Sequence, residues 1–378
     1  MSNTISLTFT SPPRTWAEVN LKNLLHNYGV AQQCHQGDIM AILKAGAYGH
    51  GMEQISQYLE NIETSPPPVF FGVASVIEAR RLVNSGIKTR IYLLGATCSF
   101  EREEIVINRW TPCISTLDEA RHFHELAMKH QFQAPLKVHI AVDTGMGRGG
   151  FLPENVLENI QSIQNLSYIE IEGIGSHLPS ADEDEVFTNE QFSQFSFIIE
   201  KLEEQPFQYR HLANSAGLLA YKSTHTNLFR PGLMLYGIAP IPSYQDQLKP
   251  VLSLKSRVTL VRSLPAGHGV SYGRDTVLKQ ETKVATIGIG YGDGYPRSLP
   301  AEQTYVLIRG KRCPLLGRVT MDQIMVDVSS LAECFEGDEV ELFGENILVS
   351  EISDLAATIP WALLTGITPR VVRVYSES

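Results

Sequence analysis

The stretch IMAILK at residues 39–44, followed by the run MEQISQYLENI at residues 52–62, sets the pattern for the first part of the chain. IMAILK is a short and nearly continuous apolar run, which is typical of a strand buried on both faces. In MEQISQYLENI the apolar residues recur three and four positions apart, which predicts a helix with one buried side. Together the two runs predict a strand followed by a helix.

The same alternation continues from about residue 16 to residue 240. The other predicted strands are VFFGVAS (69–75), RIYLLG (90–95), TPCIS (111–115), LKVHIAVD (136–143), IEIEGIGSH (169–177), YRHLAN (209–214) and LMLYG (233–237). Eight strand–helix units over about 220 residues predict an α/β fold, a (β/α)8 barrel of the TIM type, whose sites lie at the C-terminal strand ends. A doubly wound sheet has the same spacing and stays open as an alternative.

After about Ile241 the pattern changes. The runs there are VLSLKSRVTLVRSL (251–264), KVATIGIGYGDG (283–294), TYVLIRGKRCPLLGRVTMDQIMVDVS (304–329) and DEVELFG (338–344). Their β-branched residues, broken by Gly, Pro and Asp turns, predict a mainly antiparallel β domain. We expect a barrel over residues 14–242 and a β domain over 243–378, with which residues 1–13 could pack.

The composition limits the classes of function. Among 378 residues, 41 acidic against 31 basic side chains argue against nucleic-acid binding, because affinity for phosphate needs clustered Lys and Arg. There is no apolar run of about 20 residues and no secretory signal pattern, so we expect a cytoplasmic protein that does not bind membranes. The five scattered cysteines form no CxxC pair, which predicts reduced thiols and no metal site.

The first candidate site follows the first strand, in AILKAGAYGHG at residues 41–51. Lys44 falls where a barrel places catalytic groups. The small residues after it, with Tyr48 and the glycines, suit an amine that a cofactor approaches closely and binds covalently. A surface lysine that leads into a glycine-rich turn fits the position equally well.

A second segment, AVDTGMGRGGF at residues 141–151, contains a formal G-x-G-x-x-G match. A dinucleotide site is a weak hypothesis here, because such glycines are common at strand ends. Arg148 is better explained as a cation near a carboxylate or a cofactor oxygen.

Polar residues also follow other predicted strands. They are His177 in GIGSHLPSADE, Asn214 and Ser215 in HLANSAG, and Arg230 in FRPGLMLYG. Backbone N–H groups near Asn214 and Ser215 could hold a phosphate. Each segment also has a purely structural explanation: a core histidine, a helix cap or a surface arginine. In the β domain, the turns hold Tyr272, Tyr291, Met321 and Asp322 among glycines.

Taken in order, these segments resemble the bacterial alanine racemases from about Trp16 to Arg373. The matching blocks are LKAGAYGHG, VDTGMGR, SHLPSAD, NSAG, FRPGLMLYG, VSYG, IGYGDGYPR and TMDQIMVD. The resemblance implies a pyridoxal 5'-phosphate (PLP) enzyme that racemises a small amino acid, with alanine the leading substrate. In that family D-alanine supplies peptidoglycan precursors.

The resemblance also implies a role for each site residue. Lys44 would bind PLP and act as one catalytic base, and Tyr272 would be the other base, donated to the partner subunit of a homodimer. Arg230 would face the pyridine nitrogen, with His177 behind it. The phosphate would lie against Tyr48, Ser215, Gly232 and Leu233, with Asn214 beside them, and the substrate against Arg148, Tyr291, Met321 and Asp322.

The chemistry agrees with these roles. Racemisation removes the α-proton from one face and returns it on the other, so two groups must flank the α-carbon. A guanidinium at the pyridine nitrogen disfavours protonation of the ring. This argues against the main alternative, a PLP-dependent decarboxylase of the same architecture. A serine or broader racemase stays open, whereas a non-catalytic PLP-binding protein leaves the β domain and Tyr272 unexplained.

Three departures from the family pattern concern Gly46, Ala141 and Pro369. The family often has Asn at the position of Gly46, and some members have a phosphate-contacting Tyr that aligns with Pro369. Many members carry a carbamylated lysine at the position of Ala141, where it steadies the arginine that matches Arg148. Because alanine offers no negative charge, we expect a substitute partner: a bound anion, chloride first, or else a carboxylate or an ordered water.

Overall fold

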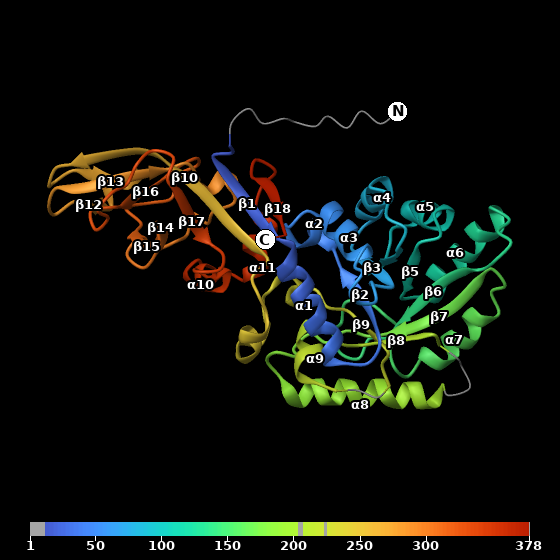
Figure 1. Ribbon diagram of the computed structural model, residues 1–378. Helices are drawn as coiled ribbons and strands as arrows, with labels where there is room; N and C mark the ends of the chain where they lie inside the picture. The colour runs from blue at the N-terminus through green and yellow to red at the C-terminus, as the bar shows by residue number, and fades with distance from the viewer. Residues whose placement is uncertain (1–11, 203–206, 223–224, 378) are drawn as a thin grey trace, which may run out of the picture. The chain divides into compact units, whose positions relative to one another are not determined.

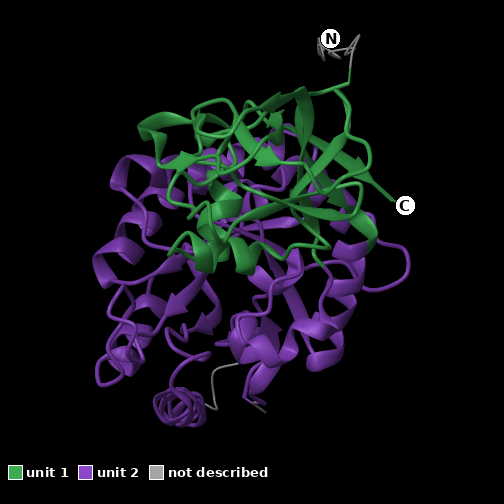
Figure 2. Cartoon of the chain, turned by 90° about the vertical axis from the view of Figure 1, so that its left-hand side faces the viewer, with its two compact units in different colours: residues 1–22, 250–378 green, residues 23–249 purple. Residues whose placement is uncertain are grey.

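The structure, a computed structural model, describes residues 12–202, 207–222 and 225–377. The chain forms two compact units (Figure 2). One contains residues 23–249, and the other contains the described part of residues 1–22 together with residues 250–378. The domain boundaries expected from the sequence, at residues 14 and 242, stay a prediction.

Unit 23–249 is built on a sheet of eight parallel strands (Figure 1). The strands are β2 (Asp38–Ile42), β3 (Phe70–Val73), β4 (Arg90–Leu93), β5 (Thr111–Ile114), β6 (Leu136–Ala141), β7 (Ile169–Gly175), β8 (Tyr209–His211) and β9 (Leu228–Phe229). Neighbours in the sheet follow chain order, and β9 returns to pair with β2. The N–H of Asn227 donates to the carbonyl of Arg210 at 2.9 Å, which joins the two ends of the sheet. The predicted barrel is confirmed.

Helices alternate with these strands and lie around the sheet (Figure 1). They are α1 (Leu21–Cys34), α2 (Lys44–Tyr48), α3 (Met52–Glu60), α4 (Val76–Asn84), α5 (Arg102–Ile107), α6 (Leu117–Lys129), α7 (Val156–Gln164), α8 (Glu185–Lys201) and α9 (Ser215–Ala220), with short 3-10 turns η1 (Ser99–Glu101), η2 (Leu233–Tyr236) and η3 (Pro242–Gln247). The sequence explains α6 well. Thr116 caps its first turn by accepting from the N–H of Glu119, and Ala120, Phe123 and Ala127 form its buried side. No helix in the described ranges is long and apolar enough to cross a membrane.

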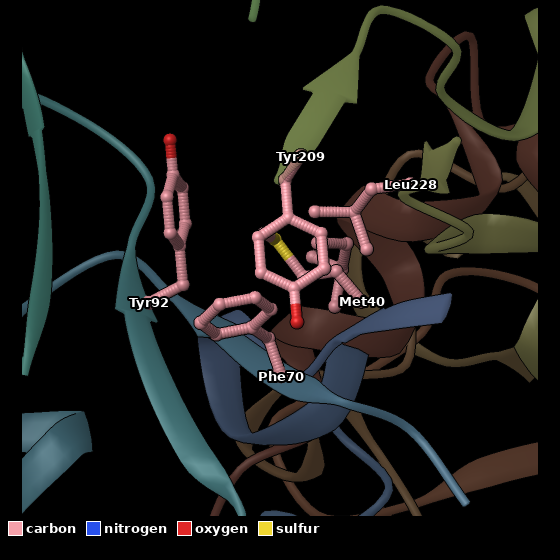
Figure 3. Close-up of a cluster of buried hydrophobic side chains, with 6 residues drawn as sticks. Met40, Phe70, Tyr92, Tyr209 and Leu228 are labelled. Carbon is pink, nitrogen blue, oxygen red and sulfur yellow. The ribbon is translucent and has the colours of Figure 1, made fainter. Parts of the chain in front are cut away.

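The interior of the barrel is closed by large side chains from opposite strands. The cluster contains Met40, Ile42, Phe70, Tyr92, Tyr209 and Leu228, five of which are labelled in Figure 3. The rings of Phe70 on β3 and Tyr209 on β8 meet edge to face with centroids 5.2 Å apart. A contact between strands so far apart in the sheet is possible because the sheet curls upon itself.

The eighth strand was expected in the wrong place. LMLYG at residues 233–237 was predicted to be a strand, but Leu233–Tyr236 forms the 3-10 turn η2, and the eighth strand is Leu228–Phe229 just before it. All four residues of η2 are buried, so their apolar pattern is the same as that of a buried strand. The turn Pro231–Gly232, at which the strand ends, was the better indicator.

The other unit is a mainly antiparallel sheet, as predicted. Its strands are β1 (Thr15–Asn20), β10 (Leu252–Leu264), β13 (Thr282–Ile287), β14 (Tyr305–Ile308), β15 (Lys311–Pro314), β16 (Ile324–Asp327), β17 (Glu339–Phe343) and β18 (Val372–Ser376), with the short ribbon β11 (Gly269–Val270) and β12 (Thr276–Val277) beside them. Among the described ladders of this unit, only the β1–β18 pair is parallel. Helices α10 (Val349–Leu355) and α11 (Pro360–Gly366) and the turns η4 (Tyr272–Arg274) and η5 (Tyr291–Asp293) complete the unit.

Candidate active site

The barrel gathers most of the predicted site residues at one end. Lys44 directly follows β2, Arg148 lies in the loop after β6, and His177 follows β7. Asn214 and Ser215 follow β8, and Arg230, Gly232 and Leu233 follow β9. Because all of these strands are parallel, every one of these residues lies at the C-terminal end of the barrel, where this architecture holds its sites.

The backbone after Lys44 makes an uncommon left-handed turn. Ala45, Gly46, Ala47 and Tyr48 have φ angles of 53°, 64°, 55° and 50°. For residues other than glycine this region costs roughly 1–2 kcal/mol each, and it is rarely adopted by consecutive residues. Hydrogen bonds from the N–H of Ala47 to Leu43 and from Gly49 to Ala45 support the turn. Strain of this kind is concentrated at functional sites.

The environment of Lys44 favours a free amine. Burial, and next the guanidinium of Arg148, lower the pKa of Lys44 from its usual value, while the carboxylate of Glu78 opposes the shift. A larger fraction of the amine is therefore neutral near pH 7 than for a surface lysine. A neutral lysine amine is the form that attacks a carbonyl group.

A small polar cluster forms where the loops after β2, β8 and β9 meet. The hydroxyl of Ser215 accepts from the N–H groups of Gly232 at 3.0 Å and Met234 at 3.2 Å. A Cβ added at Gly232 would lie 2.8 Å from the hydroxyl oxygen of Tyr48, so only glycine lets this backbone approach Tyr48. Burial raises the pKa of Tyr48 to about 12, which keeps its hydroxyl a hydrogen-bond donor. Asn214 caps α9 through the N–H of Gly217.

Arg230 is a buried cation held only by neutral acceptors. Its guanidinium donates to the carbonyls of Ser176 at 2.7 Å and Leu212 at 3.0 Å. It also contacts Nδ1 of His211 at 2.6 Å and Nδ1 of His177 at 3.2 Å. Among the described residues, no carboxylate forms an ion pair with it. Burial lowers the pKa of Arg230 to about 10, so it stays charged at neutral pH.

Both histidines beside Arg230 must be neutral. A guanidinium can only donate, so Nδ1 of His177 and Nδ1 of His211 both act as acceptors. Burial, and next the charge of Arg230, lower the pKa of His177 to about 3 and lower that of His211 well below its usual value. The His211 proton is therefore on Nε2, which lies 2.9 Å from Nδ1 of His139.

Beyond these hydrogen bonds, a longer polar contact leads on to Glu172. Since Nδ1 of His139 accepts from His211, its proton is on Nε2, which faces the carboxylate of Glu172 at 3.6 Å. Glu172 is buried and forms ion pairs with Arg90 at 2.6 Å and Lys137 at 2.8 Å. Two hydrogen bonds and one longer contact thus lead from the guanidinium of Arg230 to a buried carboxylate.

Sequence analysis did not identify His139, His211 and Glu172 as part of the site. Each is a polar residue within an apolar strand, in LKVHIAVD, YRHLAN and IEIEGIGSH respectively. All three are almost fully buried. A polar residue in the middle of a strand that is buried on both faces must have a hydrogen-bond partner, and this indication was available from the sequence.

Arg148 lies in the loop after β6 and is exposed in the single chain. Asp143 shapes the loop by accepting from the N–H groups of Gly145 and Gly147. In the described part of the chain no carboxylate forms an ion pair with Arg148. The substitute carboxylate considered for Ala141 is therefore not seen within this chain.

The other unit brings the remaining site residues together on two loops. The N–H of Tyr291 donates to the carbonyl of Thr320, and that of Gly292 to the carbonyl of Met321. Asp322 forms an ion pair with Arg370 at 2.7 Å, and Arg370 also lies 3.3 Å from buried Asp293. Met321 and Tyr291 are exposed.

Tyr272 lies on a strained turn. Its side chain is 71% exposed. Ser271 before it has φ 64° and ψ −174°, a region populated almost only by glycine, and Arg274 after it has φ 52°. The hydroxyl of Ser271 donates to the carbonyl of Arg318 at 2.7 Å, which fixes the turn against the loop that leads to Met321. The fold thus holds an exposed tyrosine in a defined position.

Comparison with known proteins explains why these blocks occur together. The N-terminal domain of alanine racemase matches residues 19–240, and the C-terminal domain of the same family matches residues 251–375. The chain belongs to the alanine racemase family.

Individual members of the alanine racemase family are similar over nearly the whole chain. The alanine racemase of Carboxydothermus hydrogenoformans is 38% identical over 376 residues, which cover 95% of this chain and 99% of that protein. That of Clostridium tetani is 37% identical over 373 residues, 95% of each chain. Among solved structures, an alanine racemase of Clostridium difficile 630 has a TM-score of 0.90 at 33% identity, covering 97% of this chain and 96% of that chain.

The backbone explains one departure from the alanine racemase pattern. Gly46, which replaces the Asn found in many members, has φ 64° in the left-handed turn after Lys44. Glycine and asparagine are the residues that adopt this region most readily, so the exchange leaves the turn intact. Pro369 lies exposed just before β18, and its correspondence to a phosphate-contacting tyrosine stays a prediction.

Proposed function

We propose that this protein is a PLP-dependent alanine racemase, which interconverts L- and D-alanine. The observation that carries the proposal is the pairing, at one end of the barrel, of an amine of lowered pKa with a buried guanidinium that has only neutral partners. The relatives that match nearly the whole chain are alanine racemases, which supports the same activity.

The residues fit PLP in three places. The lowered pKa of Lys44 favours the neutral amine that a Schiff base requires. Tyr48, Ser215, Gly232 and Leu233 would hold the phosphate, where Gly232 leaves no room for a side chain. Arg230 would donate to the pyridine nitrogen. That nitrogen would be one more neutral acceptor for the guanidinium, beside its two carbonyl and two histidine partners. When bound, PLP withdraws electrons from the α-carbon of the substrate.

The protein residues then divide the proton transfers between two faces. Lys44 would accept the α-proton from one enantiomer, and Tyr272 of a second copy would hold or accept the proton on the opposite face. Three residues would orient the substrate: Arg148, whose charge attracts the substrate carboxylate, together with Met321 and Asp322. Tyr291 would lie beside the substrate. Because Nδ1 of His177 and Nδ1 of His211 accept from Arg230, they keep the guanidinium directed toward the ring.

The exposed surface supports a homodimer with shared sites. Large apolar side chains that follow β3, β4, β6 and β7 are exposed around the C-terminal end of the barrel: Ile77, Phe100, Leu152 and Val186. On the other unit, Tyr272, Tyr291 and Met321 are exposed on polar turns. We assign these exposed apolar side chains to an interface with a second copy of this chain. The free cysteines suit a reducing compartment, so we propose a cytoplasmic location.

The first prediction locates the cofactor. Purified protein reduced with borohydride should carry a pyridoxyl label on Lys44, because the burial of its amine and the charge of Arg148 favour the neutral form. Peptide mapping by mass spectrometry gives the labelled residue. Lys137, which pairs with Glu172 inside the barrel, is the internal control and should stay unlabelled. A label at any other lysine contradicts the assignment. Interconversion rates for alanine, serine and larger amino acids then define the substrate.

The second prediction concerns the partner of Arg148. Ala141 supplies no charge, and no carboxylate within the described chain pairs with Arg148, so in the dimer we expect a bound chloride to take that place. At fixed ionic strength, activity or thermal stability should rise when an inert anion is replaced by chloride. A crystal grown with bromide should show an anomalous peak beside Arg148. A guanidinium held by protein oxygens alone, with no peak, rules out the halide.

A further inference from the structure

The carboxylate of Glu78 joins two strand ends of the barrel. One oxygen accepts from the N–H of Ala45 at 2.6 Å, in the segment after β2. The other oxygen accepts from the N–H of Ala74 at 2.8 Å, in the segment after β3. Glu78 itself is in the first turn of α4. One side chain thus ties the segment that carries Lys44 to the neighbouring strand and helix.

The arrangement departs from an ordinary helix cap. Ser75 caps α4 by accepting from the N–H of Glu78 at 3.3 Å. In the usual capping box, the glutamate at this position returns to the N–H of the capping residue. Here the carboxylate reaches past Ser75 to Ala74 and to Ala45, a residue more than thirty positions earlier in the chain. The carboxylate of Glu78 therefore binds the loop after β2 as well as the start of its own helix.

The bond to Ala45 acts on the strained part of the site. Ala45 is the first residue of the left-handed turn, and the side chain of Lys44 leaves the backbone immediately before it. Such a turn persists only where the surrounding structure holds it. A charge-assisted bond to its first N–H is a suitable restraint, because bonds to a carboxylate are about twice as strong as neutral ones. Glu78 also brings a negative charge near the amine of Lys44.

We propose that Glu78 is a positioning residue for the cofactor lysine. Its carboxylate holds the left-handed turn from Ala45 to Tyr48 and so fixes the direction of Lys44 and the place of Tyr48 against Gly232. The inference rests on the proposed function, since it assigns Lys44 to PLP. It concerns a residue that touches neither the cofactor nor the substrate and acts through the backbone.

The test compares Glu78→Gln with Glu60→Gln. Glutamine keeps the size of the side chain but has one acceptor oxygen and no charge, so it cannot serve both N–H groups as before. Glu60→Gln is the control for the loss of charge: one carboxylate oxygen of Glu60 accepts from the backbone N–H groups of both Lys88 and Thr89, which lie just before β4, at the opposite end of the barrel. Both variants lose a carboxylate charge that binds two backbone N–H groups, but a glutamine at position 60 can keep its single acceptor oxygen in place.

Three measurements separate positioning from general stability. The affinity of the apoprotein for PLP, by fluorescence titration, should fall about tenfold in Glu78→Gln, the effect of losing one bond to a charged group, and stay within about threefold in Glu60→Gln. Competitive acetylation of the apoprotein with peptide mapping should show that Lys44 titrates at lower pH in Glu78→Gln only. Urea unfolding gives the stability of each variant, and both should stay folded under the conditions of the PLP titration.

The outcomes distinguish this inference from the proposed function. Equal PLP affinity in the two variants, with unchanged titration of Lys44, overturns the role of Glu78 even if the enzyme racemises alanine. If the unchanged protein binds no PLP, the proposed function fails, while the titration of Lys44 still tests Glu78. If Glu78→Gln does not fold, Glu78→Asp keeps the charge with a shorter reach and should weaken PLP binding, and binding as tight as in the unchanged protein overturns the proposal.

Discussion

Lys44→Ala and Tyr272→Phe are each expected to lower alanine racemisation by about 10²–10⁴-fold, the usual effect of removing a general acid or base. Each change removes the group that serves one face of the α-carbon. When the two inactive chains are mixed and allowed to exchange, activity should return to about a quarter of the normal value. Half of the dimers are then mixed, and each mixed dimer has one site with both groups intact. Racemisation rates measured by circular dichroism give the result.

The shared-site arrangement has a clear control. Tyr305→Phe removes a hydroxyl from another tyrosine of the same unit, where it bonds to Glu351 on the surface. This variant should keep near-normal activity alone. When Tyr305→Phe is mixed with Lys44→Ala, the activity should equal that of the sites that contain Lys44, with no gain from mixing. If exchange is verified by mass spectrometry of tagged chains and no activity returns for the Lys44 and Tyr272 pair, the two groups do not meet across a dimer.

The architecture could be predicted from the sequence because the spacing of apolar residues differs clearly between the strands and the helices of the barrel. Six of the expected strands before residue 180 needed only small changes at their ends. The eighth was missed because η2 is buried on all sides and has no helical period. A four-residue apolar turn and a short buried strand look the same in sequence, and the hydrogen bonds that separate them depend on the strands already in place.

The site was only partly visible in the sequence. Motifs placed Lys44, His177 and Arg230 at strand ends, because the end of a parallel strand can be located from its apolar run. They could not show that Arg230 has no carboxylate partner or that Arg148 is exposed in the single chain. Such properties depend on side chains from strands distant in sequence.

The largest effect on stability is expected at Glu172. Burial alone would raise the pKa of Glu172, but hydrogen bonds from His139, Arg90 and Lys137 hold it well below its usual range. Glu172→Ala leaves these buried or half-buried groups without their anion. Because Arg90 and Lys137 are half-exposed and can be solvated, we expect a loss of about 1–3 kcal/mol, the usual effect of removing a buried hydrogen-bond partner. We expect a correspondingly lower urea midpoint at pH 7, measured by circular dichroism on the apoprotein.

Glu170→Ala is the matched control for this change. Glu170 is on the same strand β7, but its carboxylate is exposed and lies 3.8 Å from Lys137. Exposed pairs of this kind contribute about 0–1 kcal/mol. The loss of unfolding free energy should therefore be several-fold larger in Glu172→Ala than in Glu170→Ala. Equal losses would show that Glu172 is not paired as described.

The pH dependence follows from the direction of the Glu172 shift. A carboxylate whose pKa is lower in the folded state stabilises the fold above its unfolded pKa of about 4.3, and this contribution is lost as the pH falls through the folded pKa. The difference in unfolding free energy between Glu170→Ala and Glu172→Ala should thus be largest at pH 6–7 and should decrease below about pH 4. Because Nε2 of His139 faces Glu172 and Nδ1 of His139 contacts His211, the same substitution also loosens His211, one of the two histidines that hold Arg230. Folded Glu172→Ala should therefore bind PLP more weakly than Glu170→Ala at pH 7, a result that connects the interior of the barrel to its catalytic end.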